Sequence, residues 1–284
     1  MKNALKTAVL LAALGGLFMG IGVLLGGTTG LAIGLVLGLV VVGSSYWFSD
    51  KLAIKAARAV PVTREEYPQL YDTVEQLARE ADIPTPRVYV SPEMQPNAFA
   101  TGRSPRHAAV AVTQGILQVL DHDELKGVLA HELSHVKNRD ILIGSVAAAI
   151  AMGITAVVNL AYFGALFGGG SDDDDGGGVF GAILAMILAP IAASLIQMSI
   201  SRSREYQADA SGAALLHDGE PLARALEKIE AYAKQVPMNV NPAQASAYIV
   251  NPLTGRKVDF ANMFSSHPPT AERVARLRRT RVSH

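Results

Sequence analysis

Hydrophobic residues are concentrated in four long runs along this chain, at residues 4–25, 31–48, 141–167 and 179–200. The first run contains one charged residue, Lys6, and the other three contain none. A helix that crosses a bilayer needs about 20 consecutive apolar residues, within a range of about 17–25. We therefore expect four transmembrane helices. Buried core helices are the alternative, which applies best to the second run because that run is short and rich in Gly and Val.

The first run also resembles a secretory signal peptide, because Lys2 and Lys6 would form the basic region of such a peptide. Its apolar stretch is longer than the stretch of about 7–15 residues in a signal peptide. No cleavage site of the small-x-small type follows it. We expect this segment to be retained as a membrane helix.

Basic residues flank the four runs on one side only. The connector at 26–30 is uncharged, and the connector at 168–178, GGGSDDDDGGG, carries four Asp and no Lys or Arg. The positive-inside rule then places both termini and all long polar segments in the cytosol. We interpret the Asp cluster as a solvated loop rather than a cation site, because flanking glycines hold no fixed geometry. The basic flanks are Lys2, Lys6, Lys51, Lys55, Arg58, Lys137, Arg139, Arg202 and Arg204.

The polar segments 49–140 and 201–284 together are large enough for one cytosolic domain. We expect this domain to follow an N-terminal transmembrane hairpin at 1–48 and to be interrupted by a second hairpin at 141–200. The expected fold class is α+β, with four transmembrane helices and a mostly helical cytosolic domain that carries a short β-sheet.

The hydrophobic periodicity predicts the elements of this domain. A capping-box pair, Asp121 and Glu124, begins a helix that runs through His135, and its continuation into the third apolar run stays open. The expected strands cover 87–90, 97–101 and 107–113, and further helices cover 64–81, 220–235 and 270–279. The fourth apolar run is expected to continue as a helix through Arg204 to about Leu216.

Composition excludes several classes of protein. The chain has 284 residues, half of them hydrophobic, with 25 Lys and Arg, 25 Asp and Glu, and no cysteine. A chain with this much apolar surface is not intrinsically disordered. The lack of cysteine excludes a disulfide scaffold, thiol catalysis and Cys-based metal sites. The net charge of zero gives no indication of nucleic-acid binding.

An HExxH sequence at 131–135 carries the candidate chemistry. On a helix, residues i and i+4 face the same way, so His131 and His135 can reach one metal ion. Glu132 would then lie beside the ion, where it can take a proton from an activated water. The pattern predicts one Zn²⁺ per chain, with Glu132 as the general base.

A catalytic zinc site takes a third protein ligand, and four downstream residues could supply it. The sequence SRSREYQAD at 201–209 favours Glu205, because Glu205 and Asp209 share one face of a helix. Glu205 would bind the metal while Asp209 accepts a hydrogen bond from a ligand imidazole. The alternative is a pair of solvated acids beside Arg202 and Arg204. The four candidates are Glu205, Asp209, His217 and His267.

Three blocks together resemble the HtpX branch of the M48 metallopeptidases: HELSH at 131–135, SRSREYQAD at 201–209 and SSHPPTAERVARL at 265–277. These are bacterial membrane zinc endopeptidases, related to the prenyl-protein proteases of eukaryotes. The resemblance extends over nearly the whole chain. It implies a zincin-type core of the gluzincin class, location in the bacterial inner membrane, and a role in protein quality control under stress. The implied zinc ligands are His131, His135 and Glu205, with Glu132 as general base.

Peptide hydrolysis passes through an oxyanion that needs a donor besides the metal. His267 is favoured because its block matches the family and the two prolines after it would fix its position; the alternative is a structural residue at a helix start. The other candidates are Tyr206, Arg273 and Asn97. The substrate is expected to add as a strand to a sheet edge formed by Asn97, Ala98 and Phe99.

The leading hypothesis is a membrane-integrated zinc endopeptidase that cuts misfolded or damaged membrane proteins on the cytosolic side. A prenyl-protein protease-like activity is a second hypothesis, which four spans support poorly because they enclose little volume. A third is a non-proteolytic membrane scaffold with a structural zinc site, which would have no use for Glu132. The expected partners are protein substrates and the lipid bilayer, without nucleic acid.

Overall fold

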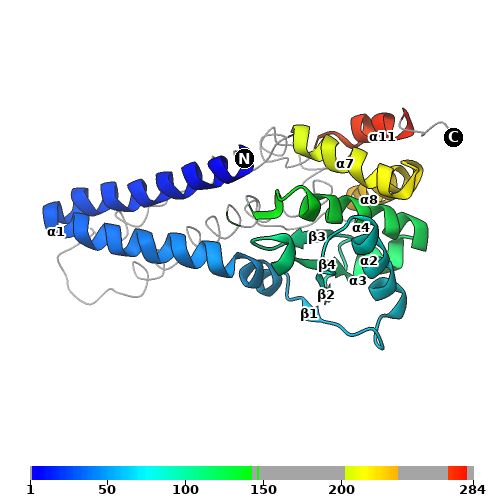
Figure 1. Cartoon of the computed structure of the whole chain (residues 1–284), viewed down its shortest axis with the longest axis horizontal. Coiled ribbons are helices and arrows are strands. Elements are labelled where there is room, and N and C mark those ends of the chain that lie inside the picture. The colour runs from blue at the N-terminus through cyan, green and yellow to red at the C-terminus, as the bar shows by residue number, and fades with distance from the viewer. Residues whose placement is uncertain (1, 143–145, 147–201, 236–267, 280–284) are drawn as a thin grey trace.

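The structure is a computed structural model that describes residues 2–142, 146, 202–235 and 268–279. A long helix, α1 (Lys2–Ala56), extends from a folded body that contains the sheet and the other described helices (Figure 1). α1 folds back on itself as two arms (Figure 1), and Gly27 between the arms has a φ of 57°. A Cβ at Gly34 would lie 2.3 Å from the carbonyl oxygen of Phe18, so glycine is needed where the arms touch.

A mixed sheet with the strand order β1-β2-β4-β3 forms the floor of the folded body. β2 (Arg87–Ser91) is parallel to β4 (Ala109–Thr113), while β1 (Val60–Pro61) and β3 (Ala98–Thr101) are antiparallel edge strands. All residues of β4 are buried, as a central strand requires. The predicted strands at 87–90 and 97–101 are confirmed to within one residue. β1 was not predicted, because two residues show no periodicity.

The prediction of a strand from residue 107 is wrong at its first residues. Pro105 instead begins a single 3-10 turn, η1 (Pro105–His107), because its fixed φ suits a helical turn. The strand itself begins at Ala109. His107 is therefore an exposed turn residue, and its ring lies 3.0 Å from the hydroxyl of Ser104.

The helices of the first half begin at recognisable signals. α2 (Pro68–Glu80) begins later than predicted because proline occupies its first turn. The hydroxyl of Thr113 caps α3 (Gln114–Val119), a short helix that the pattern did not predict. The predicted capping box at Asp121 and Glu124 begins α4 (His122–Lys137). α4 ends there because Arg139 is left-handed, with a φ of 57°.

The second half supplies α7 (Arg202–Leu216), α8 (Glu220–Gln235) and α11 (Thr270–Arg279), close to their predicted ranges. α7 and α8 both pack against α4, and α11 packs on α8 and α7 (Figure 1). A Cβ at Gly127 of α4 would lie 2.6 Å from the backbone nitrogen of Leu222, so the small residue allows α8 its close approach.

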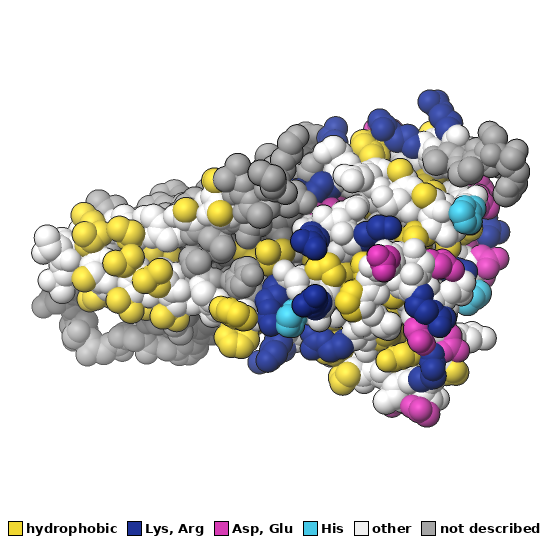
Figure 2. Space-filling view, viewed as in Figure 1, with side chains coloured by type: hydrophobic (Ala, Val, Ile, Leu, Met, Phe, Trp, Pro, Cys, Tyr) yellow, Lys and Arg dark blue, Asp and Glu magenta, His cyan; other side chains and the backbone are white. Residues whose placement is uncertain are grey.

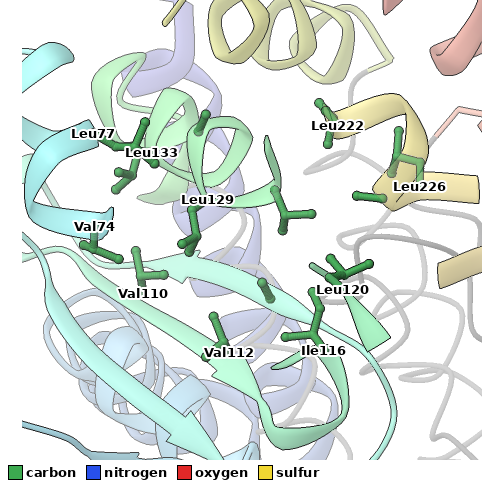
Figure 3. Packing of buried hydrophobic residues seen from close by; sticks show 14 of the residues in the cluster. Val74, Leu77, Val110, Val112, Ile116, Leu120, Leu129, Leu133, Leu222 and Leu226 are labelled. Atoms are coloured by element: carbon green, nitrogen blue, oxygen red, sulfur yellow. The ribbon is translucent and has the colours of Figure 1, made fainter. Parts of the chain in front are cut away.

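A single hydrophobic cluster lies between the sheet and the helices (Figure 3). Val110 and Val112 of β4 face Leu129 and Leu133 of α4. Leu226 of α8 belongs to the same cluster. Because α4 contributes to this cluster along its length, its apolar side is fixed against the sheet. The opposite side of α4 is thereby turned toward α7.

The predicted membrane helices are described only in part. The runs at 4–25 and 31–48 form the two arms of α1. The runs at 141–167 and 179–200 lie outside the described residues, except for Ile141, Leu142 and Val146. Within the described ranges, no helix meets the length and hydropathy needed to cross a membrane.

Candidate metal centre

α4 and α7 bring together three side chains that could hold a metal ion. The Nε2 atoms of His131 and His135 lie 3.2 Å apart on the side of α4 that faces α7. The Glu205 carboxylate of α7 reaches to 3.6 Å from His131 Nε2 and 3.7 Å from His135 Nε2. One ligand atom from each of the three residues lies within 4.8 Å of the others. The structure thus assembles the three residues that the HExxH sequence and the 201–209 segment indicate.

The close packing of α7 on α4 depends on a glycine at the point of contact. A Cβ at Gly212 would lie 3.0 Å from the backbone nitrogen of His131, which is tighter than ordinary packing. Gly212 follows Glu205 by about two helical turns, so both face α4. The missing side chain lets Glu205 approach the histidines.

His131 is held from the side away from the other ligands. Its Nδ1 lies 2.9 Å from Oδ1 of Asp209, one turn after Glu205 on α7. This contact assigns the Nδ1 proton to the hydrogen bond and leaves the Nε2 lone pair for a metal. Asp209 also accepts two hydrogen bonds from Arg273 of α11, at 2.9 Å from Nε and 2.7 Å from Nη2. His131, Asp209 and Arg273 are all buried.

The charges of this group shift one another's pKa values. Burial lowers the pKa of His131, but the hydrogen bonds to Asp209 and Glu205 outweigh it and raise that pKa from 6.5 to about 9. Burial raises the pKa of Asp209, but Arg273 and His131 together bring it well below its usual range. The carboxylate of Asp209 therefore stays ionised, and the buried guanidinium keeps a counter-charge.

A second carboxylate holds His135. Both oxygens of Asp140 lie 3.2 Å from His135 Nδ1, and Asp140 is buried. Burial lowers the pKa of His135, and the negative charges of Glu205 and Asp140 raise it above its ordinary value. Asp140 is not among the residues that the sequence patterns predict for the site. The available signal was a lone acid five residues after His135, just beyond the end of the helix.

Glu132 points toward the strand β3, whereas the carboxylates that contact His131 and His135 belong to α7 and to the residues after α4. Its carboxylate accepts a hydrogen bond of 2.9 Å from the backbone nitrogen of Ala100 in β3. β3 is an edge strand of the described sheet, so its other side carries no strand among the described residues. The general-base candidate thus contacts β3 at the residue that follows the predicted substrate edge, Asn97–Phe99.

The remaining candidates lie in different places. Tyr206 contacts α11, with its ring 3.8 Å from the guanidinium carbon of Arg276. Burial and the hydrogen bond to Glu272 raise the pKa of the Tyr206 hydroxyl. Asn97 is buried just before β3, where its backbone nitrogen bonds the hydroxyl of Thr113. His267 lies outside the described residues, and His217 is exposed at the end of α7.

The donor set fits a divalent metal of the zinc type. Two imidazoles and one carboxylate are the protein ligands of many catalytic zinc sites. Both imidazoles also have a carboxylate on Nδ1, as ligand histidines do when their Nε2 atoms bind metal. Asp209 is buried and bonded, so a description as a solvated acid does not apply to it.

Comparison with known proteins gives consistent results. The sequence model of the family described as Peptidase family M48 matches residues 64–281. A Protease HtpX homolog of Syntrophobacter fumaroxidans is 52% identical over 282 residues, covering 98% of this chain and 99% of that protein. Those of Desulforapulum autotrophicum and Pyrococcus furiosus are each 51% identical, covering 98% and 96% of this chain and 90% and 94% of their own lengths.

A solved structure shares the fold. The crystal structure of S. mikatae Ste24p matches with a TM-score of 0.53 and 19% sequence identity. The match covers 97% of this chain, which spans 65% of that protein. At this identity the likeness concerns the arrangement of the chain alone.

Proposed function

The chain belongs to peptidase family M48 and is a metalloendopeptidase, and we propose that its metal is zinc and that it acts at a membrane. We propose that it hydrolyses peptide bonds in misfolded or damaged membrane proteins on the cytosolic side. The observation that carries this proposal is the convergence of His131, His135 and Glu205 within 4.8 Å. Glu132 lies on α4 beside the two histidines.

Each side chain of the site has a distinct proposed role. His131, His135 and Glu205 hold the ion, and Asp209 and Asp140 fix the two imidazoles with Nε2 available. A bound zinc ion supplies Lewis-acid polarisation of the scissile carbonyl and lowers the pKa of a water. Glu132 accepts the proton of the attacking water and passes it to the leaving amine. His267 stays our candidate for the oxyanion donor.

The substrate peptide is proposed to add as a strand along β3. Support comes from the place of β3 at the sheet edge and from the contact between Glu132 and Ala100. A peptide that hydrogen-bonds to the backbone between Asn97 and Phe99 would pass next to Glu132. Such pairing reads backbone more than side chains, which suits an enzyme for unfolded segments.

We propose that α1 forms two membrane-spanning arms and that the runs at 141–167 and 179–200 form two more. Support comes from the second arm of α1, where every large hydrophobic side chain between Leu31 and Val40 is exposed. Exposed apolar surface of this extent is typical of a surface that meets lipid. A reporter fused at Asp173 should give no cytosolic signal. A cytosolic signal there would overturn the orientation.

The proposed activity is tested by cleavage of unfolded casein with purified, zinc-loaded protein. Glu132→Gln should retain zinc and lose at least about a hundredfold in kcat, the scale of general-base catalysis. Asp123→Asn, which removes an exposed carboxylate from the same helix, is the matched control and should cleave at the wild-type rate. Equal cleavage by Glu132→Gln would refute the mechanism. A wild type that binds zinc and cleaves nothing would favour the scaffold hypothesis.

A further inference from the structure

Cationic side chains gather where α1 meets the folded body (Figure 2). Lys51 and Lys55 lie on the last turns of α1, and Arg103 and Arg106 lie in the segment between β3 and β4. Arg103 is half-buried, and the other three are exposed. We call these four residues the basic collar. Two segments about 50 residues apart in the chain thus contribute to one charged surface next to the apolar arms.

Two exposed aromatic rings connect the basic collar to the apolar surface of α1. The guanidinium carbon of Arg103 lies 4.8 Å from the ring centre of Trp47, and Lys51 Nζ lies 5.5 Å from that of Phe48. Trp47 is 55% exposed and Phe48 is 49% exposed. Tryptophan rings are enriched at the level at which a protein crosses the lipid headgroups.

Two acids near the end of α1 are already paired with other cations. Asp50 is buried and accepts a hydrogen bond of 2.8 Å from Arg87. Glu93 forms an ion pair with Arg58. Within the described part of the chain, no carboxylate forms an ion pair with any residue of the collar. The collar therefore presents a surplus of positive charge that these acids do not neutralise.

We propose that the basic collar binds the phosphate groups of anionic phospholipids and thereby fixes the height of the folded body at the bilayer surface. This inference rests on the proposed membrane location of α1. Arg and Lys bind phosphate oxygens through charge-assisted hydrogen bonds. The rings of Trp47 and Phe48 mark the depth at which those phosphates lie.

Lipid binding at the basic collar has a consequence for the substrate edge. Arg103 follows the end of β3 by two residues, so a headgroup held by Arg103 keeps β3 near the membrane surface. A segment that emerges from the bilayer would then meet the edge strand and Glu132 within a short distance. An acidic stretch of a protein is the competing occupant of the collar, and it predicts no preference among lipids.

Trp47 makes the proposal measurable, because it is the only tryptophan in the chain. The full-length protein is reconstituted in phosphatidylcholine bilayers with a minor fraction of phosphatidylglycerol, and bromine is placed on one lipid or the other. Bromine quenches tryptophan fluorescence on contact. We expect brominated phosphatidylglycerol to quench Trp47 with a preference over phosphatidylcholine well above the value of about fivefold that one cation gives at an anionic surface, because the collar has four cations.

Two triple variants complete the test. Lys51→Gln, Lys55→Gln and Arg106→Gln together leave only Arg103, which lies on Trp47, and should reduce the preference to that single-cation ratio of about fivefold. Arg79→Gln, Arg224→Gln and Lys234→Gln remove the same charge from α2 and α8, at the end of the protein away from α1 (Figure 1), and should retain the preference. Zinc content should be unchanged in both.

The outcomes separate this inference from the membrane proposal. Equal quenching by the two brominated lipids in the wild type, or an equal preference in the two triple variants, overturns the collar and leaves α1 in the bilayer. A lack of quenching by either lipid overturns both, because Trp47 would then lie away from the membrane.

Discussion

The two histidines that we propose as metal ligands are held by carboxylates from different parts of the chain. Asp209 reaches His131 from another helix and is clamped by Arg273 of a third helix, 64 residues further along. Asp140 reaches His135 from only five residues away, on the chain that leaves the same helix. The side chain of His131 is 0% exposed and that of His135 is 15% exposed.

This difference separates two ways of orienting a metal ligand. The orientation of His131 depends on the docking of α4, α7 and α11. The buried Asp209–Arg273 pair therefore stabilises the packing of these helices and also orients His131. The orientation of His135 depends on the left-handed turn at Arg139, which brings the chain back under its own helix. Loss of Asp209 on the His131 side should therefore reduce stability and metal affinity together, while loss of Asp140 on the His135 side should reduce mainly metal affinity.

The largest expected effect follows from Asp209→Ala, which removes the carboxylate that accepts two hydrogen bonds from the buried guanidinium of Arg273. Breaking a buried ion pair in this way costs about 3–5 kcal/mol. We expect a clear fall in the thermal midpoint of the metal-free protein together with weaker zinc binding. The combined variant Asp209→Leu with Arg273→Met should regain the midpoint but not the zinc affinity. Recovery of both would show that Asp209 does not orient His131.

The second effect is a dependence on pH. The pKa of His131 is raised from 6.5 to about 9 in the metal-free fold, so protonated His131 stabilises that fold below pH 6.5. The contribution is lost as pH rises from about 6.5 to about 9, and amounts to on the order of 3 kcal/mol. Zinc must displace this proton, so zinc affinity should rise over the same interval while metal-free stability falls.

Denaturation of the metal-free protein and zinc competition against a chromophoric chelator, both at several pH values, measure these two trends. Asp209→Asn should flatten both, since the hydrogen bond to Asp209 is the largest contribution that raises this pKa. Trends of the same size in that variant would assign the proton to another group.

The next effect is confined to the His135 side. Asp140→Asn keeps a hydrogen-bonding side chain but loses the charge that holds the imidazole, and should weaken zinc binding about 10–100-fold. The thermal midpoint of the metal-free protein should fall less than in Asp209→Ala, because Arg204, the cation that Asp140 attracts, is only half-buried and also has the negative charge of Glu205 nearby. Asp123→Asn on the exposed side of α4 is the control. A fall in midpoint as large as that of Asp209→Ala would remove the distinction between the two sides.

The same contrast explains how much of the site the sequence reveals. His131, Glu132 and His135 could be predicted because one helix places them, and Glu205 and Asp209 because another does. Asp140 escaped prediction because its contact depends on the left-handed backbone at Arg139, a non-glycine residue that gives little warning of such a turn. The clamp by Arg273 depends on how α11 docks, which periodicity within α11 does not encode.

In the fold too, local features could be predicted from the sequence and contacts between distant segments could not. The helices α4, α7, α8 and α11 were predicted closely because amphipathic periods and caps are local signals. The parallel pairing of β2 with β4 and the edge position of β3 depend on contacts between strands, so the sequence predicted the strands but not their order. The edge position is the feature that gives Glu132 its contact with Ala100.

The smallest effect tests whether α7 and α11 hold His131 through the Asp209–Arg273 pair alone. Tyr206→Phe removes the hydrogen bond to Glu272 while leaving the ring under Arg276. Because this contact lies near the surface, the loss should be below about 1 kcal/mol, with zinc affinity unchanged. The hydroxyl is engaged with α11, so kcat should stay within about twofold of the wild type, well short of the loss of about a hundredfold expected for an oxyanion donor. Thermal midpoint, zinc competition and casein cleavage measure the three quantities. A hundredfold loss of kcat would make Tyr206 the donor, whereas weaker zinc binding would mean that the whole α7–α11 contact orients His131.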